Sequence, residues 1–339
     1  MRQSDLPSLG KKKPLGKNLS HGDKKPLGEF ELIRRYFTPQ TVPNTVLLGV
    51  GDDCAALAIP AGEVLVVSVD TQLPDVHFPA HANPAQIAAR ALRCAASDLA
   101  AMGATPLGFT LALTLPAVEE SWLSAFSAGL LEAAQQLHCP LIGGDTTRGA
   151  LCISIQVHGS VPAEKMLRRS GAKVGDEVWV SGSLGDGAAA LALLQNQHAF
   201  SEPAASYLER RFYHPNIDFD LVVTLRQYAS ACIDVSDGLL ADLSHICAAS
   251  LVGAKVFCDA LPISALWCDS VTQQQREQWA LCGGDDYRLC FTASTQHKTA
   301  LNKLPNLFCV GEIVVGKGVV ILDESQQAMT IPDHSYKHF

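Results

Sequence analysis

Six short segments that share one pattern constrain this chain more than any other feature of its sequence. In each, an apolar or small-residue run leads into acidic residues, glycine or hydroxyl side chains; they occupy residues 47–56, 69–71, 97–99, 143–147, 233–238 and 283–287. If even four of these segments converge in the fold, mutual repulsion raises the carboxylate pKa values and destabilises the protein unless cations intervene. Oxygen ligands without His or Cys suit hard ions. The pattern therefore predicts a site for Mg²⁺ and phosphate groups.

Length and composition narrow the class of protein further. A chain of 339 residues is long enough for two domains, each with its own core. The net charge of −8 makes the surface a poor match for nucleic acid, so we expect no nucleic-acid partner. The eleven cysteines are an odd number without a C-x-x-C spacing, which favours free thiols in a reducing cytosol. Without a recognisable signal peptide or a long apolar run, the sequence predicts a cytoplasmic protein with no membrane contact.

The order of apolar patterns predicts two domains of mixed helix and strand. Residues 1–28 are rich in lysine and contain Lys-Lys-Pro-Leu-Gly twice, so we expect a disordered extension or a cloning remnant. In the next part, helices are predicted at 29–37, 84–102 and 119–137, and strands at 46–50, 64–69, 108–115, 140–142 and 153–159. In the last part, strands are predicted at 177–181, 231–234 and near 255, 289, 308 and 319, with helices at 188–195, 219–228 and 239–250. A polar connection is expected between the first two of these helices. The domains are therefore predicted to span 29–160 and 161–339.

Two glycine-rich segments are candidates for a phosphate-binding loop. Residues 311–318 fit G-x-x-x-x-G-K, but Gly318 occupies the place of the metal-binding Ser or Thr, and no helix is expected to follow. This segment is predicted to be a hairpin turn, so the chain is not a P-loop enzyme. Residues 182–187 lead from a strand into a helix and could hold an anion on backbone N–H groups. A plain strand-to-helix turn explains this second segment equally well.

Several single residues also have two interpretations. Asp52 and Asp53 could cap a helix, or Asp53 could bind a metal with Asp52 in support. His77 lies in a loop beside an acidic strand, where it could donate a hydrogen bond to phosphate. Arg148 and Arg169 could neutralise phosphate charge, although lone arginines are more often surface residues.

Eight motifs in order resemble those of the thiamine-monophosphate kinase family. They are Gly-Asp-Asp at 51–53, Ser-Val-Asp-Thr at 68–71, Val-His-Phe at 76–78, the segment 97–104, Gly-Gly-Asp-Thr-Thr at 143–147, Arg-Ser-Gly at 169–171, Asp-Val-Ser-Asp-Gly at 234–238 and Gly-Asp-Asp-Tyr at 284–287. The resemblance extends from about residue 28 to residue 339. That family belongs to the superfamily of aminoimidazole ribonucleotide synthetase, whose members bind ATP without a P-loop.

The resemblance implies a fold, an assembly and a set of site residues. It implies a two-domain, aminoimidazole ribonucleotide synthetase-like α+β fold and a homodimer in which the N-terminal sheets pair, with ATP and several Mg²⁺ ions between the domains. Carried over by motif, the implied metal ligands are Asp53, Ser68, Asp70, Asp98, Asp145, Asp234 and Asp237. The implied nucleotide contacts are Gly144, Asp145, Arg169 and Ser236. The implied contacts to thiamine monophosphate are His77, Asp285 and Tyr336.

The chain departs from the family pattern at four positions. The family usually has Glu at the position of Asp285, an acid at Arg288, Gly at Asp75 and Asn at Ala95. None of these differences removes an implied metal ligand. Asp285 keeps the charge but is one methylene shorter, which puts a substrate contact in doubt.

The implied reaction transfers the γ-phosphoryl group of ATP to thiamine monophosphate, the last step of thiamine diphosphate biosynthesis. The acceptor phosphate is already ionised near neutral pH, so no general base is required, and bound Mg²⁺ would neutralise and align the two anionic substrates. One alternative is another ATP-dependent synthetase of the same superfamily. A second is a nucleotide-binding protein without catalytic activity.

Overall fold

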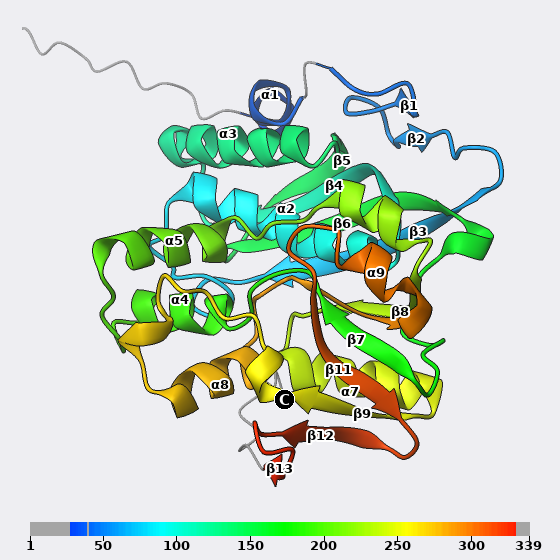
Figure 1. The fold of residues 1–339 in the computed structure, drawn as a ribbon. Helices are drawn as coiled ribbons and strands as arrows, with labels where there is room; N and C mark the ends of the chain where they lie inside the picture. Colours follow the sequence, from blue (N-terminus) through cyan, green and yellow to red (C-terminus); the bar gives the residue numbers. More distant parts are fainter. Residues whose placement is uncertain (1–27, 39–40, 330–339) are drawn as a thin grey trace, which may run out of the picture.

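Two β-sheets and their covering helices organise the part of the chain that the computed structural model describes, residues 28–38 and 41–329 (Figure 1). The prediction made for residues 1–28 therefore falls, apart from Gly28, outside the described residues. None of the described helices is long and apolar enough to cross a membrane.

The first sheet has four strands in the order β3-β6-β4-β5. Its strands are β3 (Glu63–Gln72), β4 (Thr105–Leu115), β5 (Leu141–Arg148) and β6 (Cys152–Pro162). The β4–β5 pair is parallel and the other two pairs are antiparallel. The chain before this sheet forms α1 (Glu29–Tyr36) and a small ladder of β1 (Val46–Leu48) and β2 (Ala56–Leu57).

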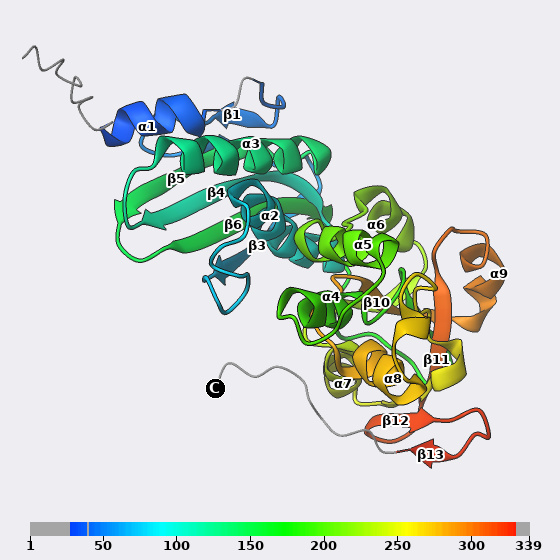
Figure 2. The same cartoon turned by 90° about the vertical axis from the view of Figure 1, so that its left-hand side faces the viewer.

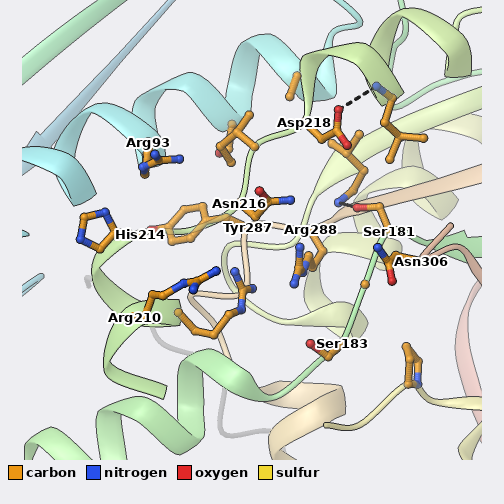
Figure 3. A pocket seen from close by; sticks show the side chains of 18 of the residues that line it. Arg93, Ser181, Ser183, Arg210, His214, Asn216, Asp218, Tyr287, Arg288 and Asn306 are labelled. Carbon is orange, nitrogen blue, oxygen red and sulfur yellow. Dashed lines mark hydrogen bonds between the residues drawn. The ribbon is translucent and has the colours of Figure 1, made fainter. Parts of the chain in front are cut away.

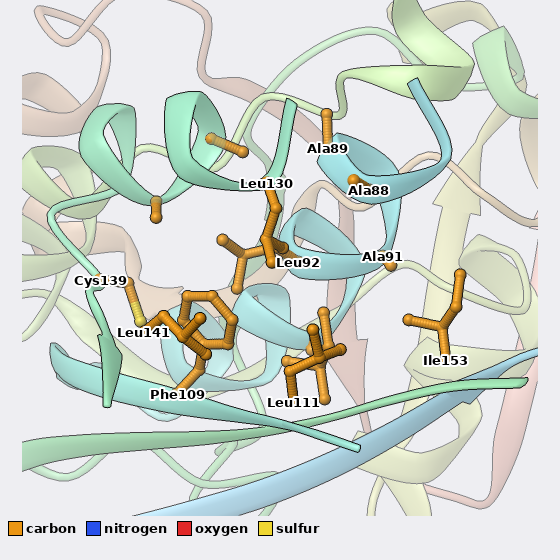
Figure 4. Packing of buried hydrophobic residues seen from close by; sticks show 14 of the residues in the cluster. Ala88, Ala89, Ala91, Leu92, Phe109, Leu111, Leu130, Cys139, Leu141 and Ile153 are labelled. Carbon is orange, nitrogen blue, oxygen red and sulfur yellow. The ribbon is translucent and has the colours of Figure 1, made fainter. Parts of the chain in front are cut away.

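Helices α2 (Pro84–Ala101) and α3 (Glu120–Gln136) pack against each other beside the first sheet (Figure 2). Helix α2 begins with Pro84 at its first position, and the side chain of Asn83 accepts a hydrogen bond from the Ala85 N–H at 2.9 Å, a favourable N-terminal cap. Leu92 of α2 and Leu130 of α3 pack with Phe109 of β4 in the core between helices and sheet (Figure 4).

The opposite face of the first sheet is uncovered in the single chain. Along β3, alternate residues point to opposite faces, and Val66 packs into the core while Leu65, Val67 and Val69 remain 48%, 48% and 62% exposed. An apolar row of this kind is unusual on the surface of a monomer.

The second sheet has seven strands in the order β13-β12-β9-β11-β7-β10-β8. Its strands are β7 (Asp176–Val180), β8 (Ala229–Asp234), β9 (Gly253–Phe257), β10 (Leu289–Ser294), β11 (Phe308–Val314), β12 (Gly318–Leu322) and β13 (Ala328–Met329). The associated helices are α4 (Asp186–Leu194), α5 (Glu202–Tyr213), α6 (Phe219–Leu225), α7 (Leu239–Ser250), α8 (Gln273–Cys282) and α9 (Lys298–Leu301). Short 3₁₀ turns occur at Ala163–Lys165, Cys258–Ala260, Cys268–Ser270 and Thr295–His297. We propose that the domain boundary lies between β6 and β7, near the predicted position 160.

The structure corrects three local predictions. The segment 196–218, expected to be a polar connection, contains α5, whose buried Ala204, Leu208 and Phe212 recur every four residues among charged neighbours. The predicted turn at 143–147 is the middle of β5, which stays paired with β4 as far as Arg148. The segment 311–318 is not a hairpin, because β11 and β12 lie on opposite sides of β9.

Candidate active site

A cleft of about 1250 Å³ lies between the two domains and gathers several of the predicted acids. We call it the acidic cleft, defined by five of its six lining carboxylates in the described part of the chain: Asp70, Asp98, Asp234, Asp237 and Asp285. They come from β3, α2, the end of β8, the loop after β8 and the loop before β10. Segments that are far apart in the sequence therefore meet here, as the repeated acidic pattern predicts.

Two serine hydroxyls hold the deepest carboxylates in place. The Ser68 hydroxyl donates to Oδ2 of Asp98 at 2.5 Å, and the Ser97 hydroxyl donates to Oδ2 of Asp234 at 2.6 Å. Burial, and then repulsion from Asp98, raises the pKa of both Asp70 and Asp234 to about 6. The cleft therefore keeps negative charge at an energetic cost, which a bound cation would offset.

The donor chemistry of the acidic cleft suits Mg²⁺ shared with a phosphate ligand. Among the described residues, no three Asp, Glu, His or Cys side chains are arranged to hold one metal ion. Mg²⁺ in phosphoryl-transfer sites usually takes only one or two carboxylates and completes its octahedron with water and substrate phosphates. Asp70, Asp98 and Asp234, with the Ser68 hydroxyl, provide oxygen donors of the required kind.

Arg90 links His77 and Asp285, the two implied substrate contacts in the cleft. Its buried guanidinium donates to the carbonyl of His77 at 3.0 Å, to the carbonyl of Phe212 at 2.8 Å and to Oδ1 of Asp285 at 2.6 Å. It also stacks on the Phe212 ring, 3.8 Å from the ring centroid. The Tyr287 hydroxyl donates to the same Asp285 oxygen at 3.1 Å. Arg90 therefore positions both His77 and Asp285 at the wall of the cleft.

His77 has a defined orientation in the loop after β3. Its Nδ1 accepts a hydrogen bond from the Leu73 N–H at 3.1 Å, which leaves Nε2 as the ring donor. The same loop contains Asp75, whose backbone is left-handed at φ 58° and whose carboxylate accepts from the Ala80 N–H at 2.9 Å. Because Asp tolerates this conformation by bonding its own turn, it can occupy the place where glycine is expected.

The loop after β8 is organised by Asp242, a buried residue that the sequence analysis did not select. Its Oδ2 accepts from the backbone N–H groups of Ser236, Asp237 and Gly238 at 3.0 to 3.1 Å. Burial, and then repulsion from Asp234, raises the pKa of Asp242 to about 7. Asp242 thus shapes the turn that presents Asp237 and Ser236 to the cleft.

The loop at 182–187 proves to be a strand-to-helix turn that holds a protein carboxylate. The N–H groups of Gly185 and Gly187 donate to Asp286 at 2.7 and 2.9 Å. Burial, and then repulsion from Asp186, raises the pKa of Asp286 to about 7. Because Asp286 already uses these two N–H groups, they are not available to a phosphate.

Four implied site residues do not meet the acidic cleft within one chain. Asp53 is exposed on the β1–β2 loop, where its N–H donates to Asp52 at 2.8 Å, and Arg169 is exposed in the connection between the sheets. Gly144 and Asp145 lie on β5, at the far edge of the first sheet from β3. Arg148, at the end of β5, is likewise exposed. Tyr336 falls outside the described residues.

Register explains why Asp145 is separated from Asp70. Asp145 pairs with Ala112, Ala112 with Ser154, and Ser154 with Thr71, so these four side chains share one face. The hydroxyls of Thr71 and Ser154 lie 2.7 Å apart on that face. Asp70, one residue before Thr71, points to the other face, toward α2. Asp145 therefore lies on the uncovered face of the sheet.

Sequence and structure comparisons identify the relatives of this chain. Residues 51–161 match the N-terminal domain, and residues 173–323 the C-terminal domain, of AIR synthase related proteins. Thiamine-monophosphate kinase from Salmonella typhimurium is 48% identical over 277 residues, which cover 81% of this chain and 85% of the relative. The chain belongs to the thiamine-monophosphate kinase family. The resemblance and the two-domain α+β fold that the motifs predict are both confirmed.

Solved structures agree with this family membership. The crystal structure of thiamine-monophosphate kinase from Stenotrophomonas maltophilia K279a has a TM-score of 0.79 and 43% identity, and the match covers 84% of this chain and 93% of that one. The structure of AaThiL complexed with AMPPCP and TMP has a TM-score of 0.75 and 30% identity, covering 82% and 88% of the two chains. Ala95, where the resemblance implies Asn, is fully buried in the core of the first domain.

Proposed function

We propose that this chain phosphorylates thiamine monophosphate to thiamine diphosphate with ATP as the phosphoryl donor. The relatives support this activity, since the Salmonella protein is a thiamine-monophosphate kinase at 48% identity and AaThiL is complexed with AMPPCP and TMP. The observation that carries the proposal is the convergence of Asp70, Asp98 and Asp234 in one cleft between the domains. Carboxylates so placed are suited to a nucleotide that brings divalent cations with it.

The residues of the cleft bind and align the substrates without acting as a base. The phosphate of thiamine monophosphate is the nucleophile and is already ionised near neutral pH, so the reaction needs no proton acceptor from the protein. Mg²⁺, held by Asp70, Asp98 and Asp234, would neutralise charge on the phosphates when bound. His77, whose Nδ1 accepts from the Leu73 N–H and whose carbonyl accepts from the Arg90 guanidinium, would contact the acceptor phosphate. Asp285, held by Arg90 and the Tyr287 hydroxyl, would help to orient the substrate.

A homodimer is part of this proposal. The exposed apolar row Leu65, Val67 and Val69 lies on the uncovered face of the first sheet, and burying it against a second copy would remove it from water. Asp145 lies on the same face, so the dimer would place this implied metal ligand at the interface rather than at the surface. We also propose that the protein acts in the cytoplasm, in keeping with its eleven free cysteines.

The direct test is product formation by the purified chain of 339 residues. With ATP, Mg²⁺ and thiamine monophosphate, we expect thiamine diphosphate and ADP in equal amounts by chromatography. Asp98→Ala should abolish turnover while circular dichroism shows a folded protein, and Glu324→Gln, which removes an exposed carboxylate, should retain it. A panel of other phosphate and carboxylate acceptors tests the rival synthetase activities. Turnover of one of these acceptors instead, or full activity in Asp98→Ala, would show that the assignment is wrong.

A further inference from the structure

A second cavity, of about 1260 Å³, lies next to the acidic cleft and has the opposite electrostatic character. We call it the basic cavity, defined by its five cationic or titratable nitrogen side chains: Arg93, Arg210, Arg211, His214 and Arg288 (Figure 3). Its walls come from α2, α5, the loop after α5, the end of β7 and the start of β10. Ser97 and Tyr287 line both cavities and separate them.

Only one of the four arginines in this cavity has a carboxylate partner among the described residues. Arg211 forms an ion pair with the buried Asp186 at 3.1 Å. Arg93 donates to the Pro215 carbonyl at 3.1 Å and to the neutral Gln136. No ion pair within 4.0 Å forms at Arg93, Arg210 or Arg288 in the described part of the chain. In a protein with a net charge of −8, this leaves three guanidinium groups around one space without a direct ion pair to the described residues, while Asp186 and Asp286 act on Arg288, and Glu132 on Arg93, from beyond that distance.

The carboxylates that also line the cavity are engaged elsewhere or lie at its edge. Asp218 caps α6, since its Oδ1 accepts from the Leu221 N–H at 2.9 Å. Glu209 accepts from the side chain of Gln86 at 3.3 Å, and Asp220 is exposed in the first turn of α6. None of the three approaches an arginine of the cavity closely enough to form an ion pair in the described residues.

Arg288 occupies the centre of this arrangement. Its guanidinium lies over Gly182, where a side chain would bring a Cβ within 2.6 Å of Arg288 Nε. This buried Nε has no hydrogen-bond partner in the part of the chain that the structure describes. Burial, and then repulsion from Arg211, lowers the pKa of Arg288 to about 10. Arg288 therefore lines the cavity as a partly buried cation with one buried donor that the described residues leave unsatisfied.

Polar and apolar groups around the arginines indicate what kind of ligand fits. Ser181, Asn216 and Asn306 surround Arg288 in Figure 3 and could bond to anionic oxygens. Ile217 and Phe308 add apolar surface beside them. Guanidinium groups pair with phosphate oxygens through two parallel hydrogen bonds, and several cations together favour a multiply charged group. The space is also larger than a free diphosphate requires.

We propose that the basic cavity is a second ligand site, for a small organic phosphate or diphosphate ester whose charged end meets Arg288, Arg210 and Arg93. The protein supplies the positive charge here, so binding needs no divalent cation. That feature distinguishes this site from the acidic cleft, where phosphates require cations. The proposal therefore stands independently of the reaction proposed for the cleft.

The test is calorimetric titration of the full chain in EDTA, with ADP and inorganic diphosphate as probes. We expect saturable binding without metal, weakened at least tenfold by Arg288→Gln and also weakened by Arg210→Gln. Lys317→Gln, which removes one exposed cation outside the cavity, should bind like wild type. Asp98→Asn should also retain metal-free binding, because Asp98 lines only the acidic cleft. Absence of saturable binding, equal loss in Lys317→Gln, or loss in Asp98→Asn would each overturn the proposal.

A second measurement on the wild-type protein does not depend on any variant folding. His214 lines the cavity, and burial together with the nearby Arg93 and Arg210 lowers its pKa, with Glu132 opposing them. An anion bound among these arginines would raise that pKa. Nuclear magnetic resonance titration of the His214 ring, with and without inorganic diphosphate in EDTA, should therefore show an upward shift. An unchanged His214 titration at saturating diphosphate would place the ligand elsewhere.

Discussion

Replacing Asp98 with Asn should stabilise the metal-free protein at alkaline pH while it removes activity. Burial, and then repulsion from Asp98, raises the pKa of Asp70 and Asp234 from 3.8 to about 6. A carboxyl group with a raised pKa holds its proton more tightly in the folded state than in the unfolded state. Ionising such a group therefore lowers the free energy of unfolding. This loss of stability grows as pH rises from about 4 through about 6 and reaches its full size above about pH 7.

The size of the effect follows from these shifts. A shift of about 2 pKa units costs about 3 kcal/mol for each carboxylate when it is ionised. Burial is the larger cause and remains in the variant, so removal of the Asp98 charge recovers about 1 kcal/mol at Asp70 and about 1 kcal/mol at Asp234. The variant also loses the charged acceptor for the Ser68 hydroxyl, which lowers its stability at both pH values. The free energy of unfolding of Asp98→Asn, minus that of wild type, should therefore be about 2 kcal/mol higher at pH 8 than at pH 5.

Thermal unfolding in EDTA measures this difference. If the chain unfolds as one unit, 2 kcal/mol corresponds to about 3 °C in Tm for a protein of this size. Added Mg²⁺ with ATP should raise the Tm of wild type more than that of Asp98→Asn. Glu324→Gln removes an exposed carboxylate and serves as the control, with no pH-dependent difference expected. If Asp98→Asn is equally stabilised or destabilised at both pH values, repulsion from Asp98 does not contribute to these raised pKa values.

Two further substitutions test the positioning of the site. Arg90→Met keeps most of the side-chain volume but leaves Asp285 without its buried cation, so we expect a loss of about 3 kcal/mol in stability. Because Asp285 and His77 also lose their positioning, KM for thiamine monophosphate should rise more than tenfold; an unchanged KM would refute the positioning role. Asp186→Ala removes the acceptor for Trp267 Nε1, the Tyr207 hydroxyl and the Arg211 guanidinium, so urea unfolding should show a loss of about 3–5 kcal/mol. Asp269→Asn, an exposed carboxylate, is the control for that measurement, and a loss below about 1 kcal/mol in Asp186→Ala would contradict the account.

The convergence of Asp70, Asp98 and Asp234 could be predicted from the sequence, and the position of Asp145 could not. The first three follow or belong to elements whose apolar pattern is plain, and each element delivers its acid toward the space between the domains. Asp145 follows Gly143 and Gly144, which indicate a turn when considered locally. The structure continues β5 through them because each residue pairs with β4. Side chains alternate along a strand, so this register alone decides which face Asp145 occupies.

Arg90 shows a second limit of sequence analysis. Its partner Asp285 is 195 positions away, and no spacing within the sequence relates the two. A local signal did exist, since Arg90 lies in an Ala-rich helix where every neighbouring position from 87 to 97 is buried. A cation on a buried helix requires an acid or several carbonyl groups as partners. That requirement predicts a partner for Arg90 without identifying it.

Helix α2 contributes to the walls of both neighbouring cavities. Arg90, Cys94 and Asp98 are four residues apart, share one stripe of the helix and line the acidic cleft. Gln86, Arg93, Ser97 and Ala100 form another stripe and line the basic cavity. The remaining positions, including Leu92 and Leu99, pack into the core. Because a single helix forms part of both walls, a ligand that shifts α2 from the basic cavity would also move Asp98 and Arg90, and with them the residues proposed to hold the substrates.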